Sequence, residues 1–193
     1  ADYQMSFYAA TKKSTENIAH SYSFLFNMPI TIFRFFTVYG PWGRPDMALF
    51  KFTKAIFDKK PIDIYNYGDM SRDFTYIDDL VNGIRLLMDK IPNTSNTDEA
   101  NFFVADSKSV IAAYRVVNIG NSRPEKLSDL IEAVEKAVGI KAVRNLMPMQ
   151  AGDVMATWAS TSLLKQLTGY QPSTDLFEGT EKFVSWYRSY YNV

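Results

Sequence analysis

Segments with helical periodicity alternate with short runs of β-branched and aromatic residues along most of this 193-residue sequence. Apolar residues at helical spacing predict helices over residues 7–26, 47–58, 78–88, 128–138, 160–169 and 176–191. Runs typical of strands cover residues 30–36, 62–66, 74–77, 114–119 and 140–146. This alternation predicts an α/β fold, and the run 30–36 has the character of a buried parallel strand.

The composition excludes several kinds of catalytic site. The sequence has no cysteine, so disulfides, thiolate zinc sites and cysteine nucleophiles are ruled out. His20 is the only histidine, which argues against a His-rich metal site and a Ser-His-Asp triad. Lysine plus arginine and aspartate plus glutamate number 21 each, so no net charge favours nucleic acid or an anionic membrane.

Membrane and targeting segments are not found in the sequence. No apolar run reaches the roughly 18 residues of a transmembrane helix, and no signal peptide opens the chain. Residue 1 is not methionine and lies just before the first predicted helix, which we interpret as a cut in a longer chain. A targeting signal ahead of that cut would lie outside the sequence.

Two segments are predicted to be loops. The segment Tyr39-Gly-Pro-Trp-Gly-Arg-Pro45 is rich in turn-forming residues but too long and too aromatic for a simple turn. Residues 92–109 are polar and have no clear period, which predicts an exposed loop. Gly139 is expected to end the helix 128–138 in a left-handed conformation.

The segment Tyr8-Ala-Ala-Thr-Lys12 pairs two residues that together can move a proton. Residues four apart on a helix share a face. A tyrosine has an unperturbed pKa of about 10, and a nearby ammonium lowers such a pKa by stabilising the phenolate. The pair could then take the proton of a sugar hydroxyl as hydride leaves the same carbon. By spacing alone, an ordinary helix with a packed tyrosine and an exposed lysine is the commoner explanation.

Further motifs follow this pair in a fixed order. They are Thr37-Val-Tyr-Gly-Pro-Trp-Gly-Arg-Pro45, Arg72-Asp-Phe-Thr-Tyr-Ile-Asp-Asp79, Asn118-Ile-Gly-Asn121 and Gly152-Asp-Val154. With the pair and the strand 30–36, this set resembles the C-terminal part of the extended short-chain dehydrogenase/reductase family. Within that family the likeness is closest to the UDP-glucuronate 4-epimerases, and it covers nearly the whole chain.

The resemblance implies a Rossmann domain that binds NAD and a smaller mixed α/β domain that binds the nucleotide sugar. Residues 1–45 would be the end of the Rossmann domain, with the catalytic helix and the next parallel strand. Residues 46–193 would mostly form the sugar-nucleotide domain, with some segments returning to the Rossmann domain. The family's glycine-rich phosphate loop would precede residue 1, as would a serine or threonine that assists the tyrosine. We therefore expect the 193 residues alone to be inactive.

The resemblance also assigns roles to single residues. Tyr8 matches the catalytic base, and Lys12 matches the lysine that stabilises the phenolate and bonds the nicotinamide ribose of NAD. Thr37 and Arg44 match positions that contact the sugar carboxylate in the glucuronate enzymes. An arginine fork suits that role because it can hold a carboxylate through two charge-assisted hydrogen bonds. Without the resemblance, Arg44 would be a surface arginine in a turn.

Three more positions match contacts to the nucleotide. Arg72 matches the arginine that grips the UDP diphosphate, and its alternative is a salt bridge to Asp73 or another local acid. Asp153 matches an acid that bonds the uridine ribose, the alternative being a loop or helix-cap aspartate. Tyr65 is expected near the uracil. Gln150 stands where galactose-specific relatives carry an arginine, which favours the glucuronate group.

The activity that the resemblance implies is an NAD-dependent isomerase that interconverts UDP-glucuronate and UDP-galacturonate through a 4-keto sugar. It further implies a cytoplasmic homodimer, paired through the face of the first helix that bears Tyr22, Phe24 and Phe26. Two sister activities stay open, those of a UDP-glucose 4-epimerase and of a nucleotide-sugar dehydratase. A fragment that binds a nucleotide sugar without turnover is the alternative from another class. The aromatic residues of the helix 176–191 are expected to form core or interface.

Overall fold

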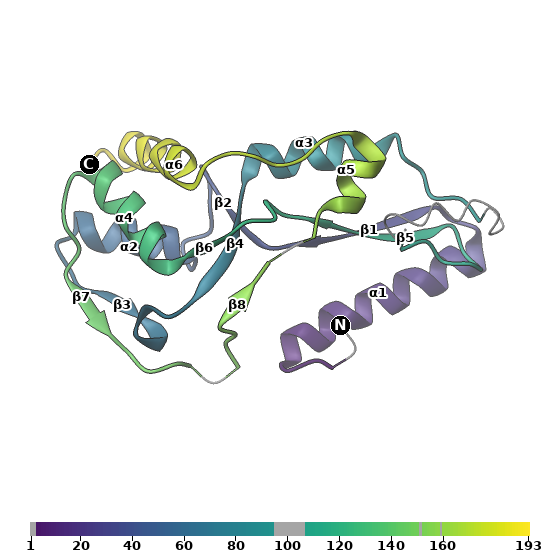
Figure 1. Cartoon of the computed structure of the whole chain (residues 1–193), viewed down its shortest axis with the longest axis horizontal. Helices are drawn as coiled ribbons and strands as arrows, with labels where there is room; N and C mark the ends of the chain where they lie inside the picture. Colours follow the sequence, from purple (N-terminus) through teal and green to yellow (C-terminus); the bar gives the residue numbers. More distant parts are fainter. Residues whose placement is uncertain (1–2, 95–106, 151, 159) are drawn as a thin grey trace. The chain divides into compact units, whose positions relative to one another are not determined.

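The chain folds as a mixed α/β protein, as the alternating sequence pattern predicts. A computed structural model describes residues 3–94, 107–150, 152–158 and 160–193 (Figure 1). Most of the predicted loop 92–109 therefore lies outside the described residues. Two compact units make up the fold. The first comprises Ala1–Phe35, Asn82–Ile119 and Ser160–Gln171, and the second Phe36–Val81, Gly120–Ala159 and Pro172–Val193.

The first unit places a pair of parallel strands between helices. Strand β1 (Ile30–Phe35) pairs in parallel with β5 (Tyr114–Ile119). Helix α1 (Phe7–Phe26) lies on one side of this pair (Figure 1). Helix α5 (Ser162–Thr168) and the second half of α3 (Ile77–Met88) lie on the other side. This helix–sheet–helix layering is that of a Rossmann-type fold.

Close packing on β5 fixes the helices of the first unit. Val117 and Ile119 of β5 and Leu164 of α5 are fully buried. Gly83 of α3 lies next to them, since a Cβ at this position would be in van der Waals contact with the Ile119 side chain at 3.5 Å and with that of Leu164 at 3.7 Å.

Helix α1 begins and ends where its sequence predicts. The Ser6 side chain accepts a hydrogen bond from the Ala9 amide at 3.2 Å, which caps the N-terminus. Asn27 ends the helix in left-handed backbone, with a φ of 48°. Among the described residues, no helix combines the length and the apolarity needed to cross a membrane.

The second unit is built on a small mixed sheet around β4 (Ser71–Tyr76). Strands β2 (Thr37–Tyr39) and β8 (Ala156–Thr157) pair with β4 in parallel. Strand β6 (Pro124–Lys126) pairs with β4 in the antiparallel direction. Strand β4 therefore contacts three segments that are far apart in the sequence.

A separate strand pair and three helices complete the second unit. Strand β3 (Ile62–Ile64) runs parallel to β7 (Arg144–Leu146). The helices are α2 (Ala48–Phe57), α4 (Leu127–Val138) and α6 (Leu176–Tyr191).

An aromatic core joins α2 and α6. The Phe50 ring lies 6.1 Å from that of Phe183 and 5.3 Å from that of Tyr187, measured between ring centroids. Tyr39 packs against Gly179 so closely that a Cβ at position 179 would clash with the tyrosine ring. Its hydroxyl donates to the backbone carbonyl that precedes α6, at 3.3 Å. The predicted aromatic stripe of residues 176–191 is thus core at Phe183 and Tyr187, which are buried.

Several predicted strand boundaries are wrong for local reasons. The predicted strand 30–36 ends at residue 35, and β2 then begins at residue 37 in the second unit. The predicted strand 62–66 ends at residue 64, because Asn66 and Tyr67 adopt left-handed backbone in a short 3-10 turn, Tyr65–Gly68. Of the predicted strand 140–146, only residues 144–146 pair. Strands β6 and β8 are not predicted, since two or three residues show no period.

Candidate active site

Tyr8 and Lys12 lie on the first turns of α1, in the first unit. The Lys12 ammonium lies 5.5 Å from the centroid of the Tyr8 ring, so the two side chains meet on one helix face. Tyr8 is 72% exposed, so its ring is not packed in the described structure. A phenol next to an ammonium and open to solvent has the geometry for proton transfer with a bound molecule.

A cavity of about 590 Å³ lies in the second unit, between β2, β4, α2 and the segments around β3 and β8. Four predicted substrate residues line it, namely Thr37, Tyr65, Arg72 and Asp153. Its apolar wall includes Phe52, Phe74 and Leu127. A cavity of this size, mostly apolar with a few polar groups, is typical of a small-molecule site.

Arg72 and Asp153 meet at this cavity through an ion pair. Arg72 Nη2 donates to Asp153 Oδ1 at 2.8 Å, and Arg72 Nη1 donates to the Met155 carbonyl at 3.1 Å. The pairing of β4 with β8 brings these distant segments together. Asp73 is fully buried and accepts hydrogen bonds from the backbone amides of residues 121 and 122 instead. The acid next to Arg72 in the structure is thus Asp153, and not Asp73.

The turn after β3 presents Tyr65 to the cavity. Asn66 and Tyr67 have φ values of 48° and 52°, and Gly68 has 88°. Three successive left-handed residues are costly in a free chain, so the surrounding structure must hold them. The Tyr67 amide donates to the Met147 carbonyl at 3.0 Å, which ties the turn to the chain leading out of β7.

Arg44 does not line the cavity. Its guanidinium forms a two-pronged ion pair with Asp46, with Nε–Oδ1 at 3.1 Å and Nη2–Oδ2 at 2.9 Å. Both side chains are exposed, at 73% and 64%, and Asp46 itself lines the cavity. Sequence reasoning missed Asp46, although its spacing two residues after Arg44 is a usable signal for a local ion pair.

The loop that carries Arg44 is held by close contacts. Gly40 has a φ of 141°, and a Cβ there would clash with the Ile77 side chain, so only glycine fits. Trp42 stacks on α6, with its ring centroid 5.3 Å from that of Trp186 and 5.2 Å from that of Tyr190. The loop is therefore held at Gly40 and at Trp42, shortly before Arg44.

Two tyrosines line the cavity, Tyr39 and Tyr65, and Tyr39 is the buried one. Burial raises the pKa of the Tyr39 hydroxyl well above its usual range, helped by the nearby acids Asp175 and Asp79. The hydroxyl therefore stays protonated and serves as a structural donor, and not as a base. No group of three or more histidine, cysteine, aspartate or glutamate side chains could hold a metal in the described ranges of the chain.

Residues 1–120 match the profile of the NAD dependent epimerase/dehydratase family, and the chain belongs to that family. Its fold and its helix-borne Tyr8–Lys12 pair are consistent with that membership. A "Probable UDP-glucuronate 4-epimerase" of Rhizobium meliloti (strain 1021) is 54% identical over 191 residues, 99% of this chain and 56% of that protein. "UDP-glucuronate 4-epimerase 4" of Arabidopsis thaliana is 47% identical over 99% of this chain and 43% of that protein.

Solved structures agree with the sequence relatives. The UDP-glucuronic acid 4-epimerase of Bacillus cereus, in complex with UDP-glucuronic acid and NAD, superimposes with a TM-score of 0.80 at 34% identity. The match covers 97% of this chain and 54% of that protein. The predicted α/β fold and the resemblance to UDP-glucuronate 4-epimerases are confirmed. The chain spans about half the length of the relatives that it matches.

Proposed function

We propose that this chain is part of a whole protein that interconverts UDP-glucuronate and UDP-galacturonate through a 4-keto sugar, with NAD as cofactor. The observation that carries the proposal is the single cavity that collects Thr37, Tyr65, Arg72 and Asp153. Relatives named for this activity support the substrate class, as does the Bacillus cereus enzyme with UDP-glucuronic acid and NAD bound.

In this proposal Tyr8 is the base that takes the proton from the sugar C4 hydroxyl. Its exposure on α1 leaves the phenolic oxygen open to a substrate. The Lys12 ammonium, 5.5 Å from the ring centroid, stabilises the phenolate by its charge. Returning the same proton completes the reaction after the sugar has turned over.

Arg72 and Asp153 are proposed to hold the nucleotide while the sugar turns. A guanidinium matches the geometry of phosphate oxygens, and a carboxylate accepts hydrogen bonds from ribose hydroxyls. Because Arg72 already donates to Asp153, the diphosphate would share or replace one prong of that contact. Tyr65 would lie beside the uracil at the same cavity.

Thr37 and Arg44 are proposed to read the sugar carboxylate. Thr37 lines the cavity at the start of β2, and its hydroxyl can donate one hydrogen bond. Arg44 is paired with Asp46 on the surface, so a substrate carboxylate would take the place of the Asp46 carboxylate on the same fork.

The residues present fit one end of NAD. The Lys12 ammonium can donate to the hydroxyls of the nicotinamide ribose beside Tyr8. The sequence holds no glycine-rich phosphate loop, so we propose that the rest of the NAD site lies outside these 193 residues. When bound, NAD⁺ supplies the acceptor for the C4 hydride and returns that hydride to the opposite face of the sugar.

The proposed domains resemble the two compact units, except that residues 36–45 belong to the second unit. Residues 1–45 would end the NAD-binding domain, and residues 46–193 would mostly form the sugar-nucleotide domain. The return of residues 82–119 and 160–171 to the first unit supports this interleaving. A homodimer through α1 is proposed on the exposure of Tyr22, Phe24 and Phe26, each more than half accessible. A cytoplasmic location rests on the resemblance alone.

The proposal is tested with the whole protein, extended to its natural start and supplied with NAD. We expect UDP-glucuronate and UDP-galacturonate each to be converted into a mixture of both, as measured by chromatography or NMR. If both sugars stay unchanged, the proposal is wrong. Faster conversion of UDP-glucose would favour the sister epimerase, and loss of water would favour a dehydratase. UDP binding without any turnover would favour the non-catalytic alternative.

A further inference from the structure

Glu16 lies on α1 one turn after Lys12, so Tyr8, Lys12 and Glu16 follow one another at intervals of four residues. Both oxygens of the Glu16 carboxylate are occupied. Arg34 Nε donates to Oε1 at 2.6 Å, and Arg34 Nη2 donates to Oε2 at 2.7 Å. Lys13 Nζ donates to Oε2 at 3.1 Å.

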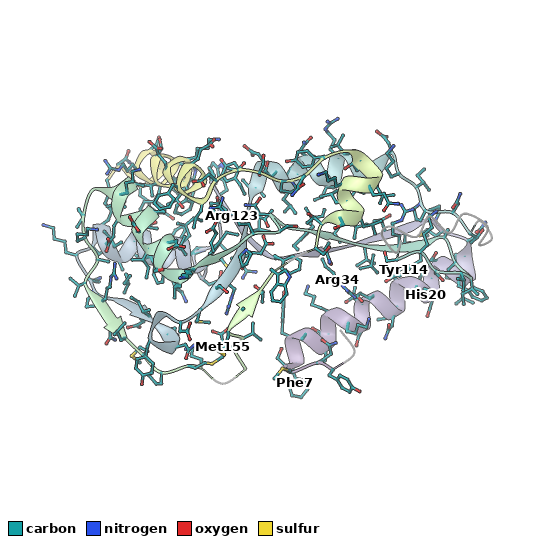
Figure 2. The ribbon with its side chains drawn as sticks, viewed as in Figure 1. Phe7, His20, Arg34, Tyr114, Arg123 and Met155 are labelled. Carbon is teal, nitrogen blue, oxygen red and sulfur yellow. The ribbon has the colours of Figure 1, made fainter. Side chains whose placement is uncertain are left out.

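This ion pair is partly buried between α1 and the strands of the first unit. The Glu16 side chain is 12% exposed and that of Arg34 is 36% exposed. Figure 2 shows Arg34 and Tyr114 along the side of α1 that faces β1 and β5. The Tyr114 hydroxyl donates to the Glu16 carbonyl at 3.2 Å, which fixes the same turn of the helix from β5.

The charge of Glu16 is strongly favoured in this setting. The hydrogen bonds from Arg34 lower the pKa of the Glu16 carboxyl more than burial raises it, and Lys13 lowers it further. The titratable groups that interact with this carboxylate are Lys13 on α1, Arg34 on β1 and Tyr114 on β5, and Lys12 lies four residues before it on the helix. At neutral pH the carboxylate is therefore an anion that needs a cationic partner.

Lys13 already donates to Oε2, and Lys12 is the other lysine of α1 at helical spacing from this anion, so it could take the place that Arg34 leaves on Oε1. A lysine and a glutamate four residues apart on a helix form an ion pair when neither has a better partner. In the part of the chain that the structure describes, Lys12 forms no ion pair, and its ammonium lies over the Tyr8 ring. Arg34, which reaches Glu16 from a different element, satisfies the carboxylate with two bonds of ideal fork geometry.

We propose that Arg34 is a positioning residue that keeps Glu16 away from Lys12, so that the Lys12 ammonium stays available to Tyr8. Arg34 touches neither the sugar nor the reacting atoms, and it acts only through Glu16. This inference rests on the proposed function, in which Tyr8 is the base and Lys12 stabilises the phenolate. It makes Glu16 harmful to catalysis once Arg34 is removed.

The test measures kcat against pH in the whole protein with NAD and saturating UDP-glucuronate. Arg34→Met keeps the apolar stem and removes the charge. We expect the midpoint of the rise in kcat to move about one unit toward alkaline pH, and kcat at neutral pH to fall about tenfold. Adding Glu16→Gln to Arg34→Met should return the midpoint to its wild-type value, because the competing anion is gone.

A purely structural role gives a different result. It predicts that the double variant is no better than Arg34→Met and that the midpoint stays in place in both, which would overturn the inference. Arg34→Lys keeps the charge next to Glu16, so it should keep the wild-type midpoint even if Arg34→Met does not fold. A shifted midpoint in folded Arg34→Lys would also overturn it.

Two controls separate this inference from the proposed function. Arg85→Met removes an exposed arginine of the same unit, which donates to Asn82 on its own helix, and should leave the midpoint unchanged. Tyr8→Phe should abolish turnover if Tyr8 is the base. Turnover that survives Tyr8→Phe refutes the role of Tyr8, whereas an inactive Tyr8→Phe with an unmoved midpoint in Arg34→Met refutes only the role of Arg34.

Discussion

Arg44, which we propose to read the sugar carboxylate, is paired with Asp46 in the structure. Its guanidinium donates two hydrogen bonds to the Asp46 carboxylate, but both side chains are mostly exposed. Exposed ion pairs contribute about 0–1 kcal/mol, so a substrate carboxylate can replace Asp46 at small cost. Arg72 differs, because its pair with Asp153 is only 19% and 33% exposed and is reinforced by the Met155 carbonyl. The Arg72–Asp153 pair is therefore held in place at the cavity, whereas the exposed Arg44–Asp46 pair can be broken at small cost.

Replacing Tyr8 removes only a hydroxyl group. Tyr8→Phe in the whole protein is expected to lower kcat by about a thousandfold or more, because the proton has no acceptor. UDP affinity by calorimetry should stay within about twofold of wild type, since the cavity that holds the nucleotide lies in the second unit. Tyr22→Phe makes the same change on the same helix, at a position where the ring packs on Phe26, and should leave kcat unchanged. Loss of UDP affinity in Tyr8→Phe would contradict the assignment.

Replacing Arg44 separates carboxylate recognition from nucleotide binding. Arg44→Ala is expected to lower kcat/KM for UDP-glucuronate by about thirtyfold, the effect of losing hydrogen bonds to a charged group. Any activity on UDP-glucose should change far less, because that sugar has no carboxylate. Arg123→Ala removes another exposed arginine, paired only locally with Glu125, and should affect neither substrate. Equal losses for the two sugars would show that Arg44 does not read the carboxylate.

Helices with apolar residues at helical spacing and a helix-breaking residue at the end could be predicted from the sequence. Helix α1 is predicted from residue 7 to residue 26 by its apolar residues at helical spacing and by the break at Asn27-Met-Pro29, and the structure gives the same bounds. The left-handed turn at Asn66 and Tyr67 could not be predicted, because the bond that holds it comes from the Met147 carbonyl, just after β7 and far away in the sequence. The contact between Arg72 and Asp153 likewise depends on the two-residue strand β8. Tertiary pairing, which leaves no local pattern, decides these features.

The link from α4 to β7 contains the clearest pH-dependent contact. Burial alone would raise the pKa of the Glu135 carboxyl, but bonds from Lys141, the Ala142 amide and Arg144 together lower it. A lowered pKa in the folded state means that Glu135 stabilises the fold fully above its ordinary value of 4.5. This stabilisation is lost as the pH falls below that value and through the folded-state pKa.

Glu135→Gln isolates that contribution. In the whole protein we expect a loss of about 1–2 kcal/mol of unfolding free energy at pH 7, moderated because Lys141 and Arg144 are largely exposed. Urea unfolding followed from pH 7 down to about pH 3 should show wild type and variant converging as Glu135 becomes protonated. Glu178→Gln breaks an exposed pair with Lys182 on α6 and should cost little at any pH. A difference that persists unchanged at low pH would assign the loss to packing instead.

At the scale of the whole molecule, the two proposed processes, nucleotide binding and hydride transfer, rely on different units of the fold. Every predicted nucleotide contact comes from the second unit, between residues 65 and 153, and these residues line one cavity. Tyr8 and Lys12 belong to the first unit, whose described sheet holds only β1 and β5. A Rossmann-type NAD site needs a phosphate loop at the start of such a sheet, and this sequence has none. The chain tested alone should therefore bind the nucleotide but show no turnover.

The 193-residue chain by itself is expected to bind UDP and to show no turnover with added NAD. Calorimetry should give a UDP affinity within about tenfold of that of the whole protein, because the diphosphate and ribose contacts are all present. Arg72→Ala in the same chain should weaken UDP binding by about tenfold or more, since a charged donor to the diphosphate is lost. Lys59→Ala, in the exposed turn after α2, serves as the control and should leave the affinity unchanged. Turnover by the chain alone would mean that the phosphate loop is dispensable. A chain that folds but fails to bind UDP would mean that residues outside it complete the cavity.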